Sequence, residues 1–465
     1  MEPSPEAELL SQAGLPEETV AAWIESWPET SEDYAGDAER FSRFWLLIAE
    51  LRGMLPAKPR RGAAETAAAE LLARLGSESR DAFLAAHVES VYRALTQDFS
   101  VHVRADELAY AAAALVPGLT PTPEEVAAES EQAQRDKEGL EIDQGIFLSR
   151  VLEHQGAGAH LCHAMLLPRQ EAVERLPELS ERGSVDLGAA TVGRIGKASF
   201  VTMRNPRFLN AEDEGTIEAV EAAVDLAILD PETEIAVLRG GTVEHPKYRG
   251  RRIFSTGINL THLYHGKISY LWYIRREMGF VNKMFRGLAR SEANPDEICG
   301  DLREKPWIAA VDAFAIGGGC QYLLATDYVV AASDAYMTLP ARKEGIIPGA
   351  ANLRLPRFTG DRIARQLIMY GRRLECDSPE GRMICDEIVP PAEMDAAVAR
   401  VVDGFTSAGV VSAAGNRRAF RVGMEPLDLF RRYMAVYARE QAYCHFSPAL
   451  ISNLERNWNA QQRQA

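Results

Sequence analysis

The chain has 465 residues, so we expect either one large domain with additions or two to three domains. Its 67 acidic and 51 basic residues give a net charge of -16, which argues against nucleic acid or an anionic membrane as the main partner. No stretch approaches the roughly 20 apolar residues that span a bilayer, and no signal peptide is evident near the N-terminus. We therefore expect a cytoplasmic protein that binds neither nucleic acid nor a membrane.

The first 195 residues are rich in Ala, Glu, Leu and Arg. Apolar positions recur at steps of three and four residues in segments such as "FSRFWLLIAELRGML", which predicts a helical N-terminal domain over residues 1–195. The segment "VPGLTPTPEE" interrupts the helices, and Thr122 with Pro123 predicts a new helix start. We expect "SVDLGAATVGRIGKA" to connect this domain to the next part of the chain.

Strand-like and helix-like segments alternate over residues 196–402, which predicts an α/β core. One helix is predicted from a stripe formed by Ile217, Val220, Val224 and Ile228. The predicted strands are "ASFVTM", "EIAVLRG", "WIAAVD", "DYVVAA" and "AYMTL". Residues 403–465 are expected to be helical again and to contribute oligomer contacts.

The six cysteines lack CxxC spacing, so neither a disulfide framework nor a zinc ribbon is predicted, and free thiols are expected. The densest group of potential metal ligands is formed by His154, His160, Cys162 and His163. Its spacing matches no common ligand pattern, and such histidines in a helical segment usually have structural roles. We expect no metal.

Two short stretches can expose backbone N–H groups, "FSTGINL" at residues 254–260 and "IGGGCQ" at residues 316–321. Glycines permit a close approach of backbone to ligand, and the second stretch opens a predicted helix whose N-terminus favours negative charge. Together the stretches could form an oxyanion hole. Taken alone, each could also be an ordinary flexible turn.

Several motifs occur in an order and spacing that resemble the crotonase (enoyl-CoA hydratase/isomerase) superfamily. They are "MRNPRFLNAEDE", "FSTGINL", "AFAIGGGCQYLLATDYVVAA", "YMTLPARKEGIIPGAANLRLPR" and "DEIVPPAEMDAAVARV". The resemblance implies a spiral of β-β-α turns that binds an acyl-CoA. It also implies that the N–H groups of Ile258 and Gly318 hold the thioester oxygen while the α-carbon becomes an enolate.

The chain departs from the hydratases of this superfamily at two positions. Where hydratases carry their two catalytic glutamates, the motifs here place Gln321 and Ala341. Addition of water across a double bond needs a general base and a general acid, so hydratase chemistry is not expected.

The helical N-terminal domain together with "GGGCQ" resembles the cofactor-independent dioxygenase branch of the superfamily. The resemblance implies that an arylacetyl-CoA, here 3,5-dihydroxyphenylacetyl-CoA, reacts with O2 through its own α-carbanion, without a metal or flavin cofactor. The products would be 3,5-dihydroxyphenylglyoxylate and free CoA, made for glycopeptide-antibiotic precursors. The partners are then the aryl-acyl-CoA and O2.

Four residues are candidates for positioning the aryl ring and O2: Glu212, Arg276, Gly319 and Ile346. Gln321 joins them because its amide both donates and accepts hydrogen bonds, which suits a phenol or a peroxide. Ile346 would line an apolar oxygen pocket. The alternatives are solvated helix charges for Glu212 and Arg276 and an ordinary core position for Ile346.

Candidate partners for the CoA phosphates are the basic residues Arg207, Lys247, Arg249 and Arg251, most of which cluster in "HPKYRGRRIF". Simple surface charge is the alternative for each. Two other functions stay open, namely an isomerase, decarboxylase or thioester hydrolase that uses Glu344 as its base, and an inactive binding scaffold. By analogy with the superfamily we expect a homo-oligomer, either a trimer or a hexamer.

Overall fold

The structure is a computed structural model that describes residues 4–294 and 302–463. The chain divides into two compact units, each assembled from segments that are distant in the sequence. The first comprises residues 1–161, 265–271 and 434–448, and the second comprises residues 162–264, 272–433 and 449–465. The three-part division expected at residues 195 and 402 stays a prediction.

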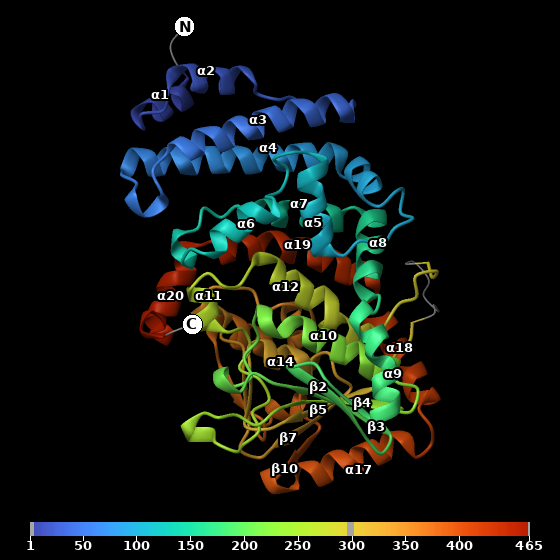
Figure 1. The fold of residues 1–465 in the computed structure, drawn as a ribbon. Helices are drawn as coiled ribbons and strands as arrows, with labels where there is room; N and C mark the ends of the chain where they lie inside the picture. Colours follow the sequence, from blue (N-terminus) through green and yellow to red (C-terminus); the bar gives the residue numbers. More distant parts are fainter. Residues whose placement is uncertain (1–3, 295–301, 464–465) are drawn as a thin grey trace. The chain divides into compact units, whose positions relative to one another are not determined.

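The first unit is built from helices, which confirms the helical N-terminal region (Figure 1). Helix α6 (Pro123–Ser130) begins where the sequence predicts. The Thr122 hydroxyl accepts a hydrogen bond from Glu125 N (3.2 Å), and Glu125 Oε2 accepts one from Thr122 N (2.8 Å). The helices that lie in this unit are α1 (Pro5–Gln12), α2 (Glu17–Glu25), α3 (Tyr34–Met54), η1 (Lys58–Arg60), α4 (Ala63–Leu95), α5 (Ala105–Leu115), α6 (Pro123–Ser130), η2 (Gln134–Asp136) and α7 (Ile142–Glu153).

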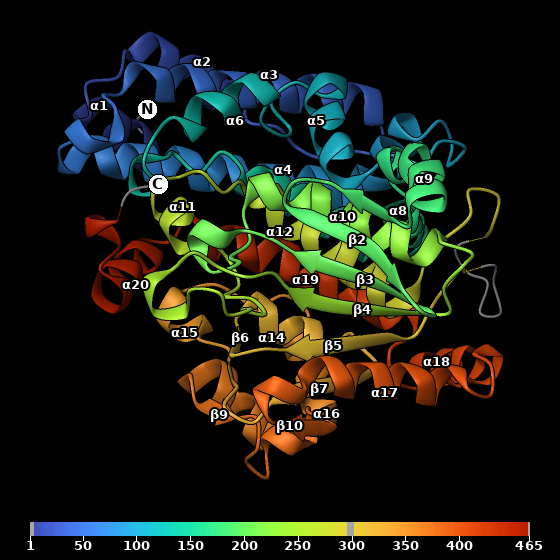
Figure 2. The ribbon, with the colours of Figure 1, turned by 60° about the horizontal axis from the view of Figure 1, so that its bottom comes forward.

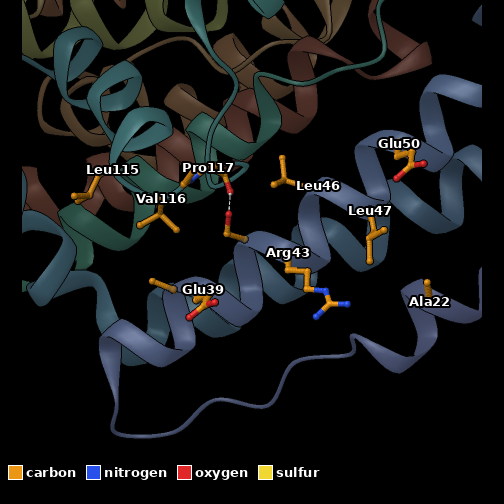
Figure 3. Close-up of a pocket in the computed structure, with 11 residues that line it drawn as sticks. Ala22, Glu39, Arg43, Leu46, Leu47, Glu50, Leu115, Val116 and Pro117 are labelled. Carbon is orange, nitrogen blue, oxygen red and sulfur yellow. Dashed lines mark hydrogen bonds between the residues drawn. The ribbon is translucent and has the colours of Figure 1, made fainter. Parts of the chain in front are cut away.

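A groove of about 540 Å³ lies in the first unit between the middle of α3 and the end of α5 (Figure 3). Its walls include Leu46, Leu115 and Val116, and the Ser42 hydroxyl donates a hydrogen bond to Pro117 O at 2.8 Å. None of the site residues predicted from the sequence lines this groove.

The second unit contains a seven-stranded sheet in the order β1-β2-β3-β4-β5-β7-β10 and a three-stranded sheet in the order β6-β8-β9 (Figure 2). β1, β2 and β3 pair antiparallel, whereas β3, β4, β5, β7 and β10 are parallel. The strands are β1 (Ser184–Asp186), β2 (Ala190–Ile195), β3 (Ala198–Met203), β4 (Ile235–Gly240), β5 (Trp307–Val311), β6 (Phe314–Ile316), β7 (Tyr328–Ala332), β8 (Tyr336–Thr338), β9 (Arg373–Glu375) and β10 (Glu387–Val389).

The five strands predicted from the sequence are confirmed as β3, β4, β5, β7 and β8, and the α/β class with them. Every residue of β4 and of β5 is buried, as expected for central parallel strands. The expectation of a mere connection over residues 184–198 is wrong, because β1 and β2 lie there. β2 contains Gly193 and little apolar alternation, so its pairing with β3 rather than its own pattern makes it a strand.

Helices cover both faces of the large sheet. α10 (Glu214–Leu229) packs against β2 and β3 through the predicted stripe, whose four members are all buried. α17 (Met394–Thr406) packs against β4, β5 and β7 on the other side (Figure 1). The unit's other helices and helical turns include α9 (Gln170–Arg182), η3 (Pro206–Phe208), η4 (Pro246–Tyr248), α11 (Leu260–Tyr264), η5 (Glu277–Val281, a π-turn), α13 (Asn282–Arg286), α14 (Gly318–Leu323), α15 (Ala341–Glu344), α16 (Ala351–Arg365), η6 (Gln366–Tyr370), η7 (Gly381–Met383), η8 (Pro391–Glu393), α18 (Val411–Met424) and η9 (Ala460–Gln462).

Four helices contain residues of both units: α8 (Gln155–Leu166), α12 (Tyr270–Arg276), α19 (Leu427–His445) and α20 (Pro448–Trp458). α18, α19 and α20 follow residue 402, which confirms the predicted helical segment there. Within the described ranges no single helix is long and apolar enough to cross a membrane, although the bent pair Pro391–Thr406 and Val411–Met424 meets the test of length and composition.

The described cysteines at positions 162, 320, 376, 385 and 444 are free thiols, as predicted, and Cys299 lies outside the described residues. Two members of the histidine-rich group have structural partners. A ring nitrogen of His160 is 2.8 Å from the Tyr92 hydroxyl, and one of His163 is 2.9 Å from Arg290 O. In residues 4–294 and 302–463 no group of three or more potential ligands is placed to hold a metal ion.

Candidate functional site

The two glycine-containing stretches lie against each other in the second unit. Gly257 has a φ of +72°, and a Cβ added there would stand 2.7 Å from Gly318 N. A Cβ added at Gly319 would stand 2.9 Å from the Ser255 Cβ. Ile316 N also donates to Ser255 O at 3.0 Å, so the stretches are joined by backbone pairing. The sequence prediction that these stretches meet is thus supported by a contact that side chains would prevent.

Two backbone N–H groups at this contact have no acceptor among the described residues. The Ile258 peptide is fixed because Glu212 N donates to Gly257 O (2.8 Å) and Asn259 N donates to Glu212 O (2.7 Å). Gly318 is the first residue of α14, where an N–H group has no acceptor within the helix. Within the part of the chain that the structure describes, neither Ile258 N nor Gly318 N donates to another protein group.

The Arg276 side chain occupies the centre of the site and uses all five of its N–H donors. Nε donates to Glu212 Oε2 at 2.5 Å, and Nη2 donates to Glu212 Oε1 at 3.3 Å. Nη2 also donates to Gly318 O at 3.0 Å. Nη1 donates to Gln321 Oε1 at 2.6 Å and to Glu277 Oε1. Arg276 therefore joins the peptide of the glycine turn to two carboxylates and one amide.

These contacts determine which way the Gln321 amide faces. Because a guanidinium can only donate, the Gln321 atom that contacts Arg276 must be the oxygen. The Gln321 NH2 group then points away from Arg276, and it has no partner among the described residues. Gln321 is thus presented as a hydrogen-bond donor, a role that an ionised glutamate at this position cannot fill.

The cluster of Glu212, Arg276, Glu277 and Gln321 is buried, with Arg276 only 3% and Glu277 only 1% exposed. Burial alone would lower the pKa of Arg276, but the carboxylates of Glu212 and Glu277 raise it well above its usual value. The guanidinium carbon of Arg276 also lies over the Tyr322 ring, 4.7 Å from the ring centroid. Two carboxylates and one guanidinium leave the cluster with one surplus negative charge.

Sequence reasoning missed three residues that complete the cluster. Glu277 follows Arg276 directly, and its Oε2 accepts a hydrogen bond from Ala350 N at 3.1 Å. Gly349 has a φ of +44°, and a Cβ there would stand 2.1 Å from Glu277 Oε1 and 2.5 Å from Gln321 Oε1. The Tyr433 hydroxyl donates to Gly349 O. An acidic residue within the largely apolar segment 270–281 was the available signal for Glu277, whereas nothing local pointed to Tyr433.

Glu344 and Ile346 shortly precede Gly349 in the sequence but are not hydrogen-bonded to the cluster in the described residues. Burial raises the pKa of the Glu344 carboxyl to about 7. Ile346 is partly buried after the end of α15, and Ala341 is buried at its start. The oxygen-pocket role of Ile346 stays a prediction.

The basic residues predicted for CoA differ in what surrounds them. Lys247 and Arg249 are exposed, and Lys247 lies over the Tyr248 ring. Arg207 lies over the Phe208 ring. Arg251 instead donates to both oxygens of Asp334 at 2.7 Å, so a phosphate would have to replace a carboxylate there. Lys247 and Arg249 are therefore better candidates than Arg251.

Comparisons with known proteins add three findings. Residues 292–431 match the family model described as "Enoyl-CoA hydratase/isomerase". The chain is 46% identical over 396 residues to (3,5-dihydroxyphenyl)acetyl-CoA 1,2-dioxygenase of Amycolatopsis orientalis, covering 85% of this chain and 90% of that one. It is 27% identical to short-chain-enoyl-CoA hydratase of Clostridium acetobutylicum, covering 52% of this chain and 84% of that one.

Solved structures are similar to somewhat more than half of the chain. Carnitinyl-CoA hydratase from Mycobacterium avium is similar with a TM-score of 0.47 and 24% identity, covering 60% of this chain and 98% of that one. OdaA from Pseudomonas aeruginosa has a TM-score of 0.48 and 18% identity, covering 58% of this chain and 99% of that one.

The buried Glu344 carboxyl makes a prediction about stability and pH. Because its folded-state pKa is raised from 4.5 to about 7, its contribution to stability is fully present below the unfolded value and is lost as pH rises through about 7. We expect Glu344→Gln to be more stable than the wild type at about pH 8, by on the order of 1–3 kcal/mol, and equally stable at about pH 4. Denaturant unfolding at both pH values measures this difference. The exposed Glu393→Gln should show no such trend, and a constant difference for Glu344→Gln across the pH range would contradict the expectation.

Proposed function

The chain belongs to the enoyl-CoA hydratase/isomerase (crotonase) superfamily, and from that premise we propose that it is a cofactor-independent dioxygenase. It converts 3,5-dihydroxyphenylacetyl-CoA and O2 into 3,5-dihydroxyphenylglyoxylate and free CoA, as a step toward a glycopeptide-antibiotic precursor. The relative at 46% identity carries the name of this activity and is matched over nine-tenths of its length.

The observation that carries the proposal is the orientation of Gln321 by Arg276. Oε1 of Gln321 is engaged by the guanidinium, so the amide can position a substrate oxygen but cannot transfer a proton. Ala341, at the position of the second hydratase glutamate, supplies no carboxyl either. The N–H groups of Ile258 and Gly318, which have no acceptor among the described residues, would stabilise an enolate, which favours enolate chemistry other than hydration.

The proposed reaction begins with loss of an α-proton from the thioester. The negative charge moves to the thioester oxygen, which accepts hydrogen bonds from Ile258 N and Gly318 N, each worth about 10²–10³ in rate. The enolate passes an electron to O2, and the α-carbon combines with the reduced oxygen. The peroxide attacks the thioester carbonyl and expels CoA. Cleavage of the O–O bond with loss of the second α-hydrogen leaves the arylglyoxylate.

The ring hydroxyls of the substrate match the polarity of the cluster. Glu212 retains acceptor lone pairs for a phenol, and Gln321 offers its NH2 group as a donor. Arg276 acts by positioning these two side chains, since its own donors are used. Gly319 has no side chain and so lets the substrate approach the backbone closely, and Ile346 lines the path of O2.

The remainder of the substrate and the assembly complete the proposal. Lys247, Arg249 and Arg207 bind CoA phosphates, and Arg251 exchanges Asp334 for phosphate. The reaction requires no metal or flavin, because the substrate carbanion is itself the electron donor. A homo-oligomer, trimeric or hexameric, stays a prediction.

The direct test is to incubate chelator-treated protein with 3,5-dihydroxyphenylacetyl-CoA while dissolved oxygen and free thiol are recorded. We expect oxygen uptake and CoA release to rise together in equal amounts, because one O2 is consumed for each thioester cleaved. CoA release that continues undiminished without oxygen would contradict the proposal and indicate a hydrolase. Activity that returns only with added iron would contradict the absence of a metal.

Gly318 provides a test of the oxyanion hole. A Cβ at this position would stand 2.3 Å from Glu212 Oε1 and 2.7 Å from Arg276 Nη2, so Gly318→Val must displace the cluster. We expect turnover to fall by about 10²-fold or more with the protein still folded. Gly415→Val is the matched control, since no heavy atom lies within 4 Å of a Cβ added there. Wild-type rates in Gly318→Val would show that the hole lies elsewhere.

Gln321→Glu tests the amide itself. The change would place a third carboxylate on the Arg276 guanidinium, inside a buried site where like charges repel strongly. We expect oxygen uptake to be lost without a gain of hydration activity toward an enoyl-CoA, since Ala341 still supplies no second carboxyl. Gln321→Ala, which adds no charge, should reduce oxygen uptake but retain enolate formation. Efficient hydration by Gln321→Glu would reveal an acid outside this site, and Glu344 would be examined first.

A further inference from the structure

Glu277 is a buried carboxylate to which the reaction outlined above gives no role. One oxygen accepts from the guanidinium of Arg276, and the other accepts from the neutral N–H of Ala350. Each carboxylate oxygen keeps a second lone pair. Glu277 also begins the π-turn η5, in which Gly279 leaves helical geometry, and such turns often occur at functional sites.

The contacts of Arg276 connect this carboxylate to the segment that forms the proposed oxyanion hole. The guanidinium spans from Gly318 O, through Nη2, to Glu277 Oε1, through Nη1. The guanidinium of Arg276 therefore connects Glu277 to Gly318, the residue whose N–H group is proposed to hold the thioester oxygen. Oε1 of Glu277 and Oε1 of Gln321 accept from the same nitrogen, so the carboxylate lies beside the residue proposed to face the substrate.

Two other carboxyl groups are less suited to accept the α-proton. Both oxygens of Glu212 are held by Arg276, through Nε and Nη2, and protonation would break this two-point ion pair. Glu344 has no hydrogen bond to the cluster in the described residues. Glu277 accepts from the cation through only one oxygen, so its other oxygen can be protonated while the hydrogen bond from Arg276 remains.

Charge balance favours a carboxylate of the cluster as the base. Glu212, Arg276 and Glu277 together carry one surplus negative charge in a buried site. If Glu277 takes up the α-proton, that surplus disappears from the cluster as the enolate charge appears at the oxyanion hole. The total charge of the buried site is then unchanged during the step, which avoids the cost of adding a second buried negative charge.

We propose that Glu277 is the catalytic base that accepts the α-proton of the arylacetyl-CoA. The α-C–H bond breaks, its proton binds to the Glu277 carboxylate, and its electron pair forms the enolate held by Ile258 N and Gly318 N. The proton is returned when the CoA thiolate departs. This assignment rests on the proposed function, because it presumes a thioester in the oxyanion hole.

The test follows exchange of the α-hydrogens for deuterium when 3,5-dihydroxyphenylacetyl-CoA is incubated with the full-length protein in D2O without oxygen. We expect the wild type to exchange and Glu277→Gln to exchange about 10²-fold more slowly or worse. Glu344→Gln, a matched removal of another buried carboxyl, should exchange at the wild-type rate. Glu277→Asp keeps the charge but draws it back by one methylene, so it should exchange slowly while still binding the thioester.

Three outcomes would overturn the assignment. Glu277→Gln could exchange at the wild-type rate while losing oxygen uptake, which would make Glu277 a positioning residue. Exchange could be lost in Glu212→Gln at saturating substrate and retained in Glu277→Gln, which would make Glu212 the base. Glu277→Gln could exchange slowly only because it no longer binds the thioester in calorimetry, while Glu277→Asp exchanges at the wild-type rate. If the wild type exchanges its α-hydrogens but takes up no oxygen, the dioxygenase proposal is refuted. The assignment of Glu277 can still be tested in that case, because the anaerobic exchange rates of Glu277→Gln and the wild type can be compared.

Discussion

The geometry of the site depends on one buried guanidinium. Arg276 donates to five acceptors that belong to three separate segments: Glu212 before α10, Glu277 in η5, and the glycine turn with α14. A buried cation that loses a partner is costly, typically by 3–5 kcal/mol, so each acceptor is held in place by the need to satisfy the charge. The same contacts that stabilise the ion therefore also set the direction of the Gln321 amide and the spacing of the two carboxylates.

Close backbone approach is the second constraint on the site. Gly257 brings its segment against the N–H group of Gly318, and Gly349 brings another turn against Glu277 and Gln321. At Gly257 and Gly349 the positive φ favours glycine, and at Gly318 any Cβ would meet the cluster. The site is thus assembled by three chain segments that touch where side chains are missing.

The C-terminal part of the chain contributes directly to the second unit. Tyr433 of α19 holds the carbonyl of Gly349. Glu425, fully buried, accepts hydrogen bonds from Arg286, Arg354 and Arg357. Burial alone would raise the pKa of Glu425, but these arginines lower it to about 2. The C-terminal helices, expected from the sequence to serve oligomer contacts, therefore also support the turn that borders the candidate site.

The sequence by itself determined the class of the fold and the chemical limits of the site. The continuous apolar runs of β4 and β5 predicted strands that are buried on both faces, and the stripe on α10 predicted the helix face that packs on the sheet. Gln321 and Ala341 already excluded proton transfer by carboxylates at the expected positions, and the glycines at positions 257 and 318 indicated a close approach of backbone. Only the tertiary structure decided that Arg276 uses all its donors internally, that Glu277 and Tyr433 join the site, and that Arg251 pairs with Asp334. Those features depend on hydrogen bonds between segments far apart in the chain, and local periodicity carries no information about which polar groups such packing brings together.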